Sequence, residues 1–302
     1  MKILRNILFA FLIFSISLNS FAEGEAEKIT PKEIKILSWN IFMLPGPFIK
    51  TNQKERAHHI AEKLIENDAD IIVLQESFHK RARRIIKNQL KEIYPHNSGK
   101  QRKKHPFKYT NSGVLILSKH PLEKIKTKFY SKCKTSDCMA SKAAVSVEAD
   151  VQGNKIQIVG THLQAWDEEE KQLVRESQCE EISKKLLFPN QKKGIAQFIV
   201  GDMNIDKKNK KRHKKMLEIL DAEDGEIVSE INATCGTKKN FFYRNNDKEG
   251  AKILDYVLFR KNESNVEVKE RFVRIFKGDW KRNGEELDLS DHYAVEAVIE
   301  IK

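Results

Sequence analysis

Carboxylate, amide and imidazole side chains recur at the ends of short apolar segments along the chain. Residues 71–74, for example, are all apolar and lead through Gln75 to Glu76. Any one such residue could cap a turn, but together they favour one reaction centre assembled at strand ends. The residues concerned are Asn40, Glu76, His162, Asp202, Asn204, Asp255, Asp291 and His292.

These residue types suit the hydrolysis of a phosphodiester. That reaction needs a hard cation, a base for water, a donor for the leaving oxygen and neutral donors for the phosphoryl oxygens. Glu76 can bind Mg²⁺, which prefers oxygen ligands, and Asn40 can hold an oxygen without adding negative charge. His162 and His292 can exchange protons near neutral pH, and Asp255 can orient an imidazole.

Short apolar, β-branched segments precede or contain most of these groups and predict strands, with helices between some of them. Gln152-Gly153-Asn154 joins two of the strands as a hairpin. Apolar stripes at helical spacing run from Ala57 to Ile65 and from Leu173 to Leu186. We therefore expect an α/β protein with mixed sheets. The predicted strands are residues 34–39, 70–74, 113–117, 143–149, 155–160, 195–200, 253–259 and 293–301.

Seven motifs follow one another in the order found in the endonuclease/exonuclease/phosphatase superfamily, which the chain resembles over residues 33–302. The resemblance implies a DNase I-like α/β fold, a four-layered sandwich of two mixed β-sheets flanked by helices. A lone Gly-Asp-x-Asn or Ser-Asp-His is weak, but seven motifs in order are specific. They occupy residues 38–45, 74–76, 111–118, 160–165, 201–204, 254–256 and 290–292.

The resemblance also implies metal ligands. Glu76 would be the main Mg²⁺ ligand, Asn40 would complete the site, and Asp291 would support the metal through water. Other hard divalent cations, such as Mn²⁺ or Co²⁺, could replace Mg²⁺. Family members often carry a second metal site with an asparagine four residues after the glutamate. Lys80 stands at that position here, which puts a second site in doubt.

Catalytic roles follow from the same resemblance. His292 would be the base that activates water, oriented by Asp255. His162 would face the leaving oxygen as general acid or electrostatic stabiliser. Asp202 and Asn204 would position the phosphate and the nucleophile.

Within the superfamily, the bacterial neutral sphingomyelinase C branch is the most similar, through Thr161-His162-Leu163-Gln164-Ala165 and the Asn-x-Phe-Met-Leu-Pro sequence that begins at Asn40. It implies hydrolysis of sphingomyelin to ceramide and phosphocholine at a phospholipid membrane surface. Haemolytic members insert an aromatic hairpin into the bilayer. The corresponding residues 272–289 have Phe276 and Trp280 but are otherwise rich in Lys, Arg, Asp and Glu, so we expect these two aromatic residues to contact a membrane.

Two alternatives remain open from the sequence. One is a secreted DNase I-like nuclease, in which basic runs at residues 100–104 and 207–215 neutralise nucleic-acid phosphates and aromatic residues 241–243 stack on bases. The other is a non-catalytic binding protein on the same fold. The formal net charge of +12 fits a polyanion, an anionic membrane or simply a solvated surface.

The N-terminal residues predict export. Lys2 and Arg5 precede an apolar run too short to span a bilayer, and Ser20-Phe21-Ala22 resembles a cleavage signal. We therefore expect a signal peptide over residues 1–22, a single catalytic domain over residues 23–302, and a secreted monomer.

Four cysteines in an exported chain suggest disulfides rather than a zinc site. Cys133 and Cys138 form the expected local pair. Cys179 with Cys235 follows by elimination, although four cysteines allow three connectivities.

Overall fold

The computed structural model describes residues 32–45, 49–102, 107–244 and 250–302. The expected signal peptide over residues 1–22 lies outside the described residues. No helix in these described ranges is long and apolar enough to cross a bilayer.

One sheet is formed by six strands in the order β10-β13-β1-β2-β4-β3. Strand β1 runs parallel to β2 and antiparallel to β13, so the sheet is mixed as predicted. The strands are β1 (Lys32–Asn40), β2 (Ile71–Gln75), β3 (His96–Asn97), β4 (Leu115–Ser118), β10 (Val266–Arg274) and β13 (Ala294–Ile301).

The second sheet has five strands in the order β5-β6-β7-β8-β9. Strands β6 and β7 form the predicted hairpin, and β7 pairs with β8 in parallel. The strands are β5 (Leu122–Phe129), β6 (Ala143–Val151), β7 (Asn154–His162), β8 (Ala196–Asp202) and β9 (Asp255–Arg260).

Both sheets are covered on both faces, which is why their central strands read as nearly continuous apolar runs. In β2, Ile71 and Val73 point into the core between the sheets, whereas Ile72 and Leu74 point to the opposite face. Ile158 and Phe198 fill the shared core from the second sheet. This alternation fixes the register of each strand, because a one-residue slip would exchange its two faces.

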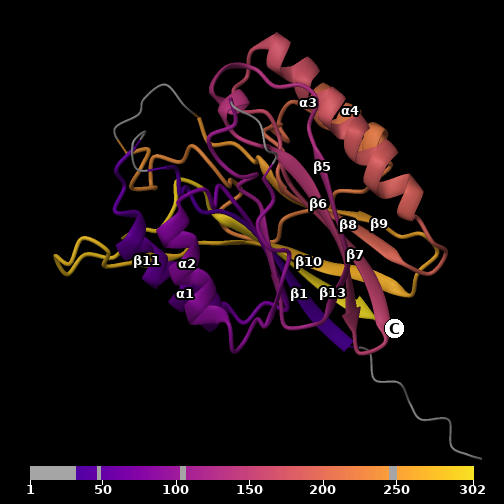
Figure 1. The fold of residues 1–302 in the computed structure, drawn as a ribbon, viewed down its shortest axis with the longest axis horizontal. Coiled ribbons are helices and arrows are strands. Elements are labelled where there is room, and N and C mark those ends of the chain that lie inside the picture. Colours follow the sequence, from indigo (N-terminus) through magenta and orange to yellow (C-terminus); the bar gives the residue numbers. More distant parts are fainter. Residues whose placement is uncertain (1–31, 46–48, 103–106, 245–249) are drawn as a thin grey trace, which may run out of the picture. The chain divides into compact units, whose positions relative to one another are not determined.

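Helices close the sandwich on its two outer faces (Figure 1). Helices α1 (Gln53–Asn67) and α2 (Lys80–Leu90) pack on the six-stranded sheet through residues such as Ile60 and Ile86. Helices α3 (Glu169–Ile182) and α4 (Lys210–Leu220) pack on the five-stranded sheet through Ile182 and Leu220. The predicted four-layered DNase I-like sandwich is confirmed.

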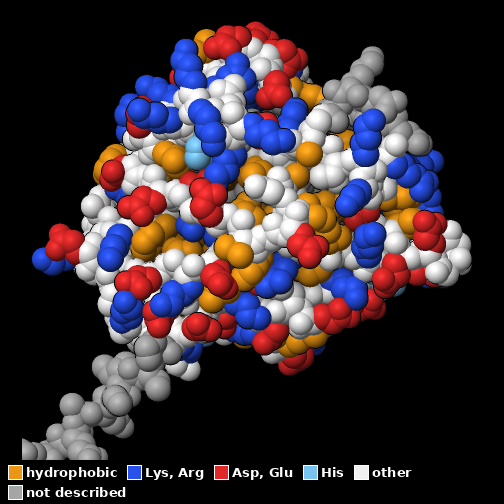
Figure 2. Space-filling model, turned by 180° about the vertical axis from the view of Figure 1, so that it is seen from behind, with side chains coloured by type: hydrophobic (Ala, Val, Ile, Leu, Met, Phe, Trp, Pro, Cys, Tyr) orange, Lys and Arg blue, Asp and Glu red, His pale blue; other side chains and the backbone are white. Residues whose placement is uncertain are grey.

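Two stretches of charged residues, 80–84 and 207–215, belong to helices. The run at residues 80–84 is the first part of α2, where the His79 ring accepts a hydrogen bond from the Ala82 amide and caps the helix. The run at residues 207–215 overlaps α4. Figure 2 shows acidic and basic side chains interspersed over one face of the protein, as on an ordinary solvated surface.

The expectation that Trp280 contacts a membrane is wrong. A short hairpin of β11 (Lys277–Gly278) and β12 (Leu287–Asp288) surrounds this residue. Trp280 is only 3% exposed, because its indole stacks on Phe242 and donates a hydrogen bond to the Asp288 carbonyl at 3.2 Å. Phe276 is half-buried beside Trp39, with their ring centroids 4.8 Å apart.

Of the two predicted disulfides, one is present in the structure and the other is not. Cys133 and Cys138 form the expected disulfide. The pairing of Cys179 with Cys235 is wrong, since both are buried free thiols. Cys179 packs from α3 into the core of the five-stranded sheet, and burial raises the pKa of its thiol to about 12. Cys235 instead forms an isolated β-bridge with His292. Elimination failed because a buried cysteine is stable as a small apolar side chain.

Candidate active site

The site lies where the ends of β1 and β2 meet the ends of β7 and β8. Asn40 at the end of β1 is in register with Gln75 at the end of β2. His162 at the end of β7 is likewise paired with Asp202, the last residue of β8. Hydrogen-bonded strand ends hold the polar side chains at fixed positions.

Gly201 is required for this arrangement. A Cβ atom at this position would lie 1.9 Å from the Thr161 carbonyl oxygen of the neighbouring strand. The absence of a side chain therefore lets β7 and β8 approach closely and brings His162 and Asp202 side by side.

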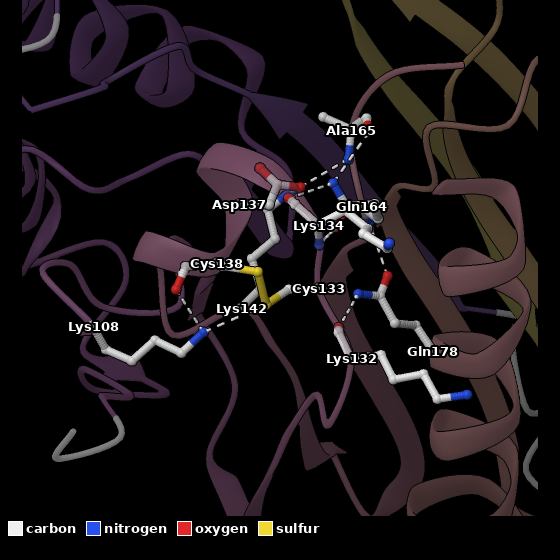
Figure 3. Close-up of a disulfide and its surroundings, with 10 residues drawn as sticks. All are labelled: Lys108, Lys132, Cys133, Lys134, Asp137, Cys138, Lys142, Gln164, Ala165 and Gln178. Atoms are coloured by element: carbon white, nitrogen blue, oxygen red, sulfur yellow. Dashed lines mark hydrogen bonds and ion pairs between the residues drawn. A yellow bond between two sulfur atoms is a disulfide. The ribbon is translucent and has the colours of Figure 1, made fainter. Parts of the chain in front are cut away.

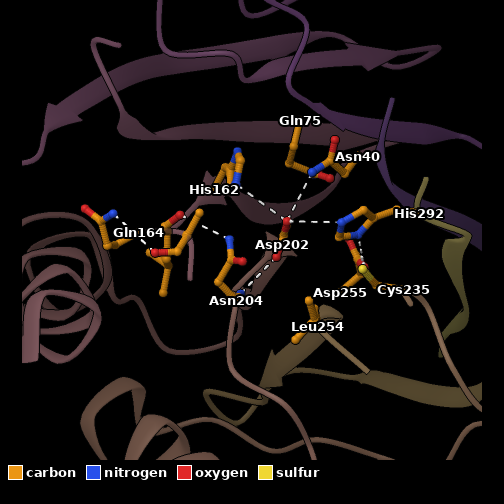
Figure 4. Close-up of polar contacts among 12 residues, drawn as sticks. Asn40, Gln75, His162, Gln164, Asp202, Asn204, Cys235, Leu254, Asp255 and His292 are labelled. Carbon is orange, nitrogen blue, oxygen red and sulfur yellow. Dashed lines mark hydrogen bonds and ion pairs between the residues drawn. The ribbon is translucent and has the colours of Figure 1, made fainter. Parts of the chain in front are cut away.

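Asp202 is the centre of the polar network (Figure 4). One carboxylate oxygen accepts a hydrogen bond from the Asn40 amide at 3.1 Å and lies 3.5 Å from Nε2 of His162. The same oxygen is 3.9 Å from Nε2 of His292. The other oxygen accepts the backbone amide of Asn204 at 2.9 Å. Asp202 thereby links the two sheets, since Asn40 ends β1 and His292 precedes β13 of one sheet, whereas His162 ends β7 of the other.

His292 is oriented by Asp255, the first residue of β9. Nδ1 of His292 lies 2.8 Å from the Asp255 carboxylate, and both side chains are buried. Burial by itself lowers the pKa of His292, but Cys235 and the carboxylates of Asp255 and Asp202 raise that pKa well above its ordinary value. The geometry is that of an imidazole held by a carboxylate, with Nε2 directed at the centre of the site.

The pKa of His162 shifts in the opposite direction. Burial, reinforced by the positive charge of Lys142, lowers the pKa of His162 to about 3. Nδ1 of this ring is buried, and none of the residues that the structure describes offers it a hydrogen bond. The pKa values of the two histidines thus shift in opposite directions, because burial dominates at His162 whereas Cys235 and the nearby carboxylates outweigh burial at His292.

Glu76 follows β2 in a left-handed backbone conformation, with φ of 54°. Burial and the neighbouring Asp291 raise the pKa of Glu76 to about 8, opposed by His292 and Lys142. Burial also raises the pKa of Asp291. Glu76 and His292 therefore lie close enough to influence one another, as the predicted single centre requires.

The residues around Glu76 fit a hard divalent cation. Oε2 of Glu76 is buried and has no hydrogen-bond partner among the described residues. A buried carboxylate oxygen without a hydrogen-bond partner, next to the second carboxylate of Asp291, is stabilised by a bound cation. A further group of possible ligands is formed by Asp202, Asp255 and His292, whose ligand atoms lie within 4.8 Å of one another. The 2.8 Å contact between His292 and Asp255 favours an orienting pair over two metal ligands.

Arg56 is a residue that the sequence analysis missed. Its side chain is completely buried in α1 beneath the site, and burial lowers the pKa of its guanidinium to about 10. It donates hydrogen bonds to the carbonyl oxygens of Ile41 at 2.7 Å, Phe42 at 3.0 Å and Leu289 at 2.9 Å. Arg56 thus joins the loop after Asn40 to the segment before Asp291. Its spacing of four residues from Ile60, on the buried face of α1, was the available signal.

Lys142 is the second missed residue, and a disulfide-bonded loop positions it (Figure 3). The loop contains the short helix η1 (Thr135–Met139) and is closed by Cys133 and Cys138. Asp137 of η1 forms an ion pair of 2.7 Å with the buried ammonium of Lys142. The ammonium also donates to the Leu163 carbonyl at 2.7 Å, directly after His162.

A strongly basic groove of about 860 Å³ borders the loop after Glu76. Phe78 and His79 line it next to the site, and no carboxylate occurs among the described residues that line it. Lys80, at the position expected for a second metal ligand, is part of this groove. The other cationic residues that line it are Lys54, Arg81, Arg83, Arg84, Lys87, Lys100 and Arg102.

Comparison with known families gives a match over residues 37–292 to the family described as Endonuclease/Exonuclease/phosphatase. Among curated proteins, sphingomyelinase C 2 of Leptospira interrogans is 29% identical over 309 residues, which cover 92% of this chain and 49% of that protein. The chain therefore spans about half the length of the Leptospira relatives it matches. Sphingomyelinase C of Bacillus cereus is 27% identical, with 93% of both chains covered.

Among solved structures, a double mutant of beta toxin from Staphylococcus aureus with bound magnesium ions has a TM-score of 0.79 and 22% sequence identity. The comparison covers 88% of this chain and 99% of that one. This likeness establishes the shared fold.

Proposed function

Taking as premise that the chain belongs to the endonuclease/exonuclease/phosphatase family, we propose that it is an exported, Mg²⁺-dependent sphingomyelinase C. It hydrolyses sphingomyelin to ceramide and phosphocholine. The observation that carries the proposal is the convergence of Asn40, Glu76, His162, Asp202 and His292 at one seam between the sheets. Curated relatives named sphingomyelinase C, which match most of the chain, support this substrate.

Glu76, Asn40 and Asp291 would hold Mg²⁺, with Mn²⁺ or Co²⁺ as possible substitutes. The cation would supply positive charge that stabilises the developing negative charge on the phosphoryl oxygens. The basic residues around Lys80 would repel a second cation, so we infer that the groove holds no metal. The disulfide between Cys133 and Cys138 agrees with export to an oxidising compartment, after removal of residues 1–22.

His292 would act as the general base, oriented by Asp255. Its Nε2 accepts a proton from water as the water oxygen bonds to phosphorus. His292 must be neutral at that moment, and positive charge held at Glu76 favours its neutral form. Asp202 fixes the position of the imidazole relative to the phosphate.

The bond from phosphorus to the ceramide oxygen then breaks, and that oxygen leaves as an alkoxide that requires stabilisation and a proton. With a pKa of about 3, His162 is neutral at pH 7 and suits hydrogen-bond donation to this oxygen better than proton transfer. Asn204 would donate a hydrogen bond to a phosphoryl oxygen. The proton that the alkoxide finally takes balances the one that His292 received from water.

The test is a substrate panel with the purified mature protein, using sphingomyelin vesicles, phosphatidylcholine vesicles and plasmid DNA, each with Mg²⁺ or EDTA. We expect phosphocholine release from sphingomyelin that EDTA abolishes. His292→Ala is expected to abolish the same release while the protein stays folded. Release that continues in EDTA, or an active His292→Ala protein, would contradict the assignment.

A second candidate function, a secreted nuclease, is favoured by the basic groove alone. Its cations could hold a nucleic-acid backbone leading towards the site, and binding would then weaken steeply with salt. Degradation of DNA without lipid hydrolysis in the same panel would select the nuclease. Inactivity on every substrate would select the third alternative, a non-catalytic binding protein.

A further inference from the structure

Aromatic side chains stand out into solvent on loops beside the active site. Phe107, Tyr109 and Trp166 are 70%, 63% and 59% exposed. Trp166 follows the catalytic candidate His162 by only four residues. Burial of aromatic rings is strongly favourable, so exposed rings near one site indicate a contact surface.

Buried neighbours hold the Trp166 backbone in place. The guanidinium of Arg175 is completely buried and donates hydrogen bonds to the carbonyl oxygens of Gln164, at 2.9 Å, and of Trp166. The Gln164 amide donates to the Gln178 side chain at 2.8 Å. Trp166 itself adopts a left-handed conformation with φ of 73°, which is unusual for a bulky residue. The backbone is therefore fixed, yet its indole remains outside the core.

The exposed rings share one rim, built around η1. The Tyr109 amide donates to the Met139 carbonyl at 2.8 Å. The Ala165 amide, next to Trp166, donates to the Asp137 carboxylate at 2.8 Å. Both acceptors belong to η1, so Tyr109 and Trp166 flank the same short helix. We call Phe107, Tyr109 and Trp166 the aromatic rim.

Charges beside Trp166 are balanced. Asp167 forms an ion pair with Lys252 at 3.0 Å, and Glu170 forms one with Lys134 at 2.9 Å. A polyanion gains little electrostatic attraction beside Trp166, in contrast to the basic groove, which Tyr109 borders at the other end of the rim. Tryptophan and tyrosine side chains favour the interface between water and lipid, where the ring is partly dehydrated.

We propose that the aromatic rim docks the protein on a zwitterionic phosphocholine bilayer and brings the site to its lipid substrate. This inference rests on the proposed sphingomyelinase function. It assigns membrane contact to the loops around η1, whereas the hairpin that contains Trp280 keeps its indole in the core.

Intrinsic fluorescence offers a direct test, because all three tryptophans of the sequence are described and only Trp166 is exposed. The full mature protein is mixed with sphingomyelin–phosphatidylcholine vesicles in EDTA, which prevents turnover. We expect the emission of Trp166 to shift to shorter wavelength and to become shielded from acrylamide. Vesicles that carry brominated phosphatidylcholine should quench it.

Cosedimentation with vesicles supplies the second measurement. Trp166→Ala should bind about tenfold more weakly or worse, the loss expected when one aromatic side chain no longer leaves water. Phe188→Ala is the matched control, because Phe188 is 51% exposed but lies beyond the far end of α3. This control should bind like wild type. The loss of binding in Trp166→Ala should also change little between about 0.05 and 0.5 M NaCl, since the charges beside Trp166 are paired.

Equal vesicle binding by wild type and Trp166→Ala would overturn the proposal, as would Trp166 emission that stays open to acrylamide on vesicles. Protection by a single-stranded oligonucleotide but not by vesicles would overturn it in favour of base stacking. Hydrolysis of a water-soluble phosphocholine ester requires the active site but no membrane docking. It therefore distinguishes failure of the docking proposal from failure of the proposed function. Trp166→Ala should hydrolyse this soluble ester as wild type does. If the wild-type protein does not hydrolyse it, the sphingomyelinase assignment is refuted, but the vesicle-binding measurements still test the aromatic rim.

Discussion

Replacing Arg56 with methionine removes the buried cation beneath the site while keeping an unbranched side chain of similar length. The carbonyl oxygens of Ile41, Phe42 and Leu289 then lose their donor inside the protein. Each buried acceptor left unsatisfied costs about 1–3 kcal/mol, so the three together cost about 3–9 kcal/mol. That is a large fraction of the roughly 5–15 kcal/mol by which a domain is stable.

Urea unfolding followed by circular dichroism measures this loss. Arg84→Met is the control, since Arg84 is an exposed arginine on the neighbouring helix α2 and its loss should change stability by less than about 0.5 kcal/mol. Arg56→Lys should recover only part of the stability, because an ammonium cannot reproduce the planar guanidinium fork. If Arg56→Met were destabilised by less than about 1 kcal/mol, the carbonyl oxygens would not depend on Arg56 as argued.

Three further perturbations test the site. Asp255→Asn should lower phosphodiester hydrolysis by about 10³-fold or more with the fold intact, because His292 loses its orienting carboxylate; steady-state rates of the two proteins check this. Glu76 has a pKa raised to about 8 in the folded chain against 4.5 as its ordinary value. The folded state therefore holds a proton that the unfolded state has lost, and stability in EDTA should fall as pH rises from about 4.5 to 8. Thermal unfolding should detect this decline, and Mg²⁺ should reduce it; a rise in stability over this range would contradict it. Replacing Cys133 and Cys138 with serine should cost about 2 kcal/mol, as expected for a short closed loop, and should lower activity through Lys142; activity equal to wild type would refute the link.

The sequence predicted the central strands well because both faces of these strands are buried. Residues 71–74 are apolar at every position, and the structure buries all of them. Strands β5 and β10 were missed because each lies at the edge of its sheet, where exposed charged residues interrupt the apolar pattern. Helix α2 was missed for a related reason, since its first turns consist largely of Lys and Arg.

The sequence could also indicate which residues converge, because strand ends are local features. It could not place Trp280, whose burial depends on Phe241 and Phe242, about forty positions earlier in the chain. Lys142 was missed for the same reason, since its role depends on Asp137 and on its approach to His162 in three dimensions. Non-local contacts of this kind leave no periodic trace in the sequence.

The hydrogen bond from Asn40 to Asp202 crosses from one sheet to the other. Neither sheet alone provides all three of the general base, the metal ligands and the residue that stabilises the leaving oxygen. Partly folded chains in which only one half has formed are therefore catalytically inert, and activity should appear during refolding only when the two halves dock. Phosphodiester hydrolysis would then begin only at the last folding step.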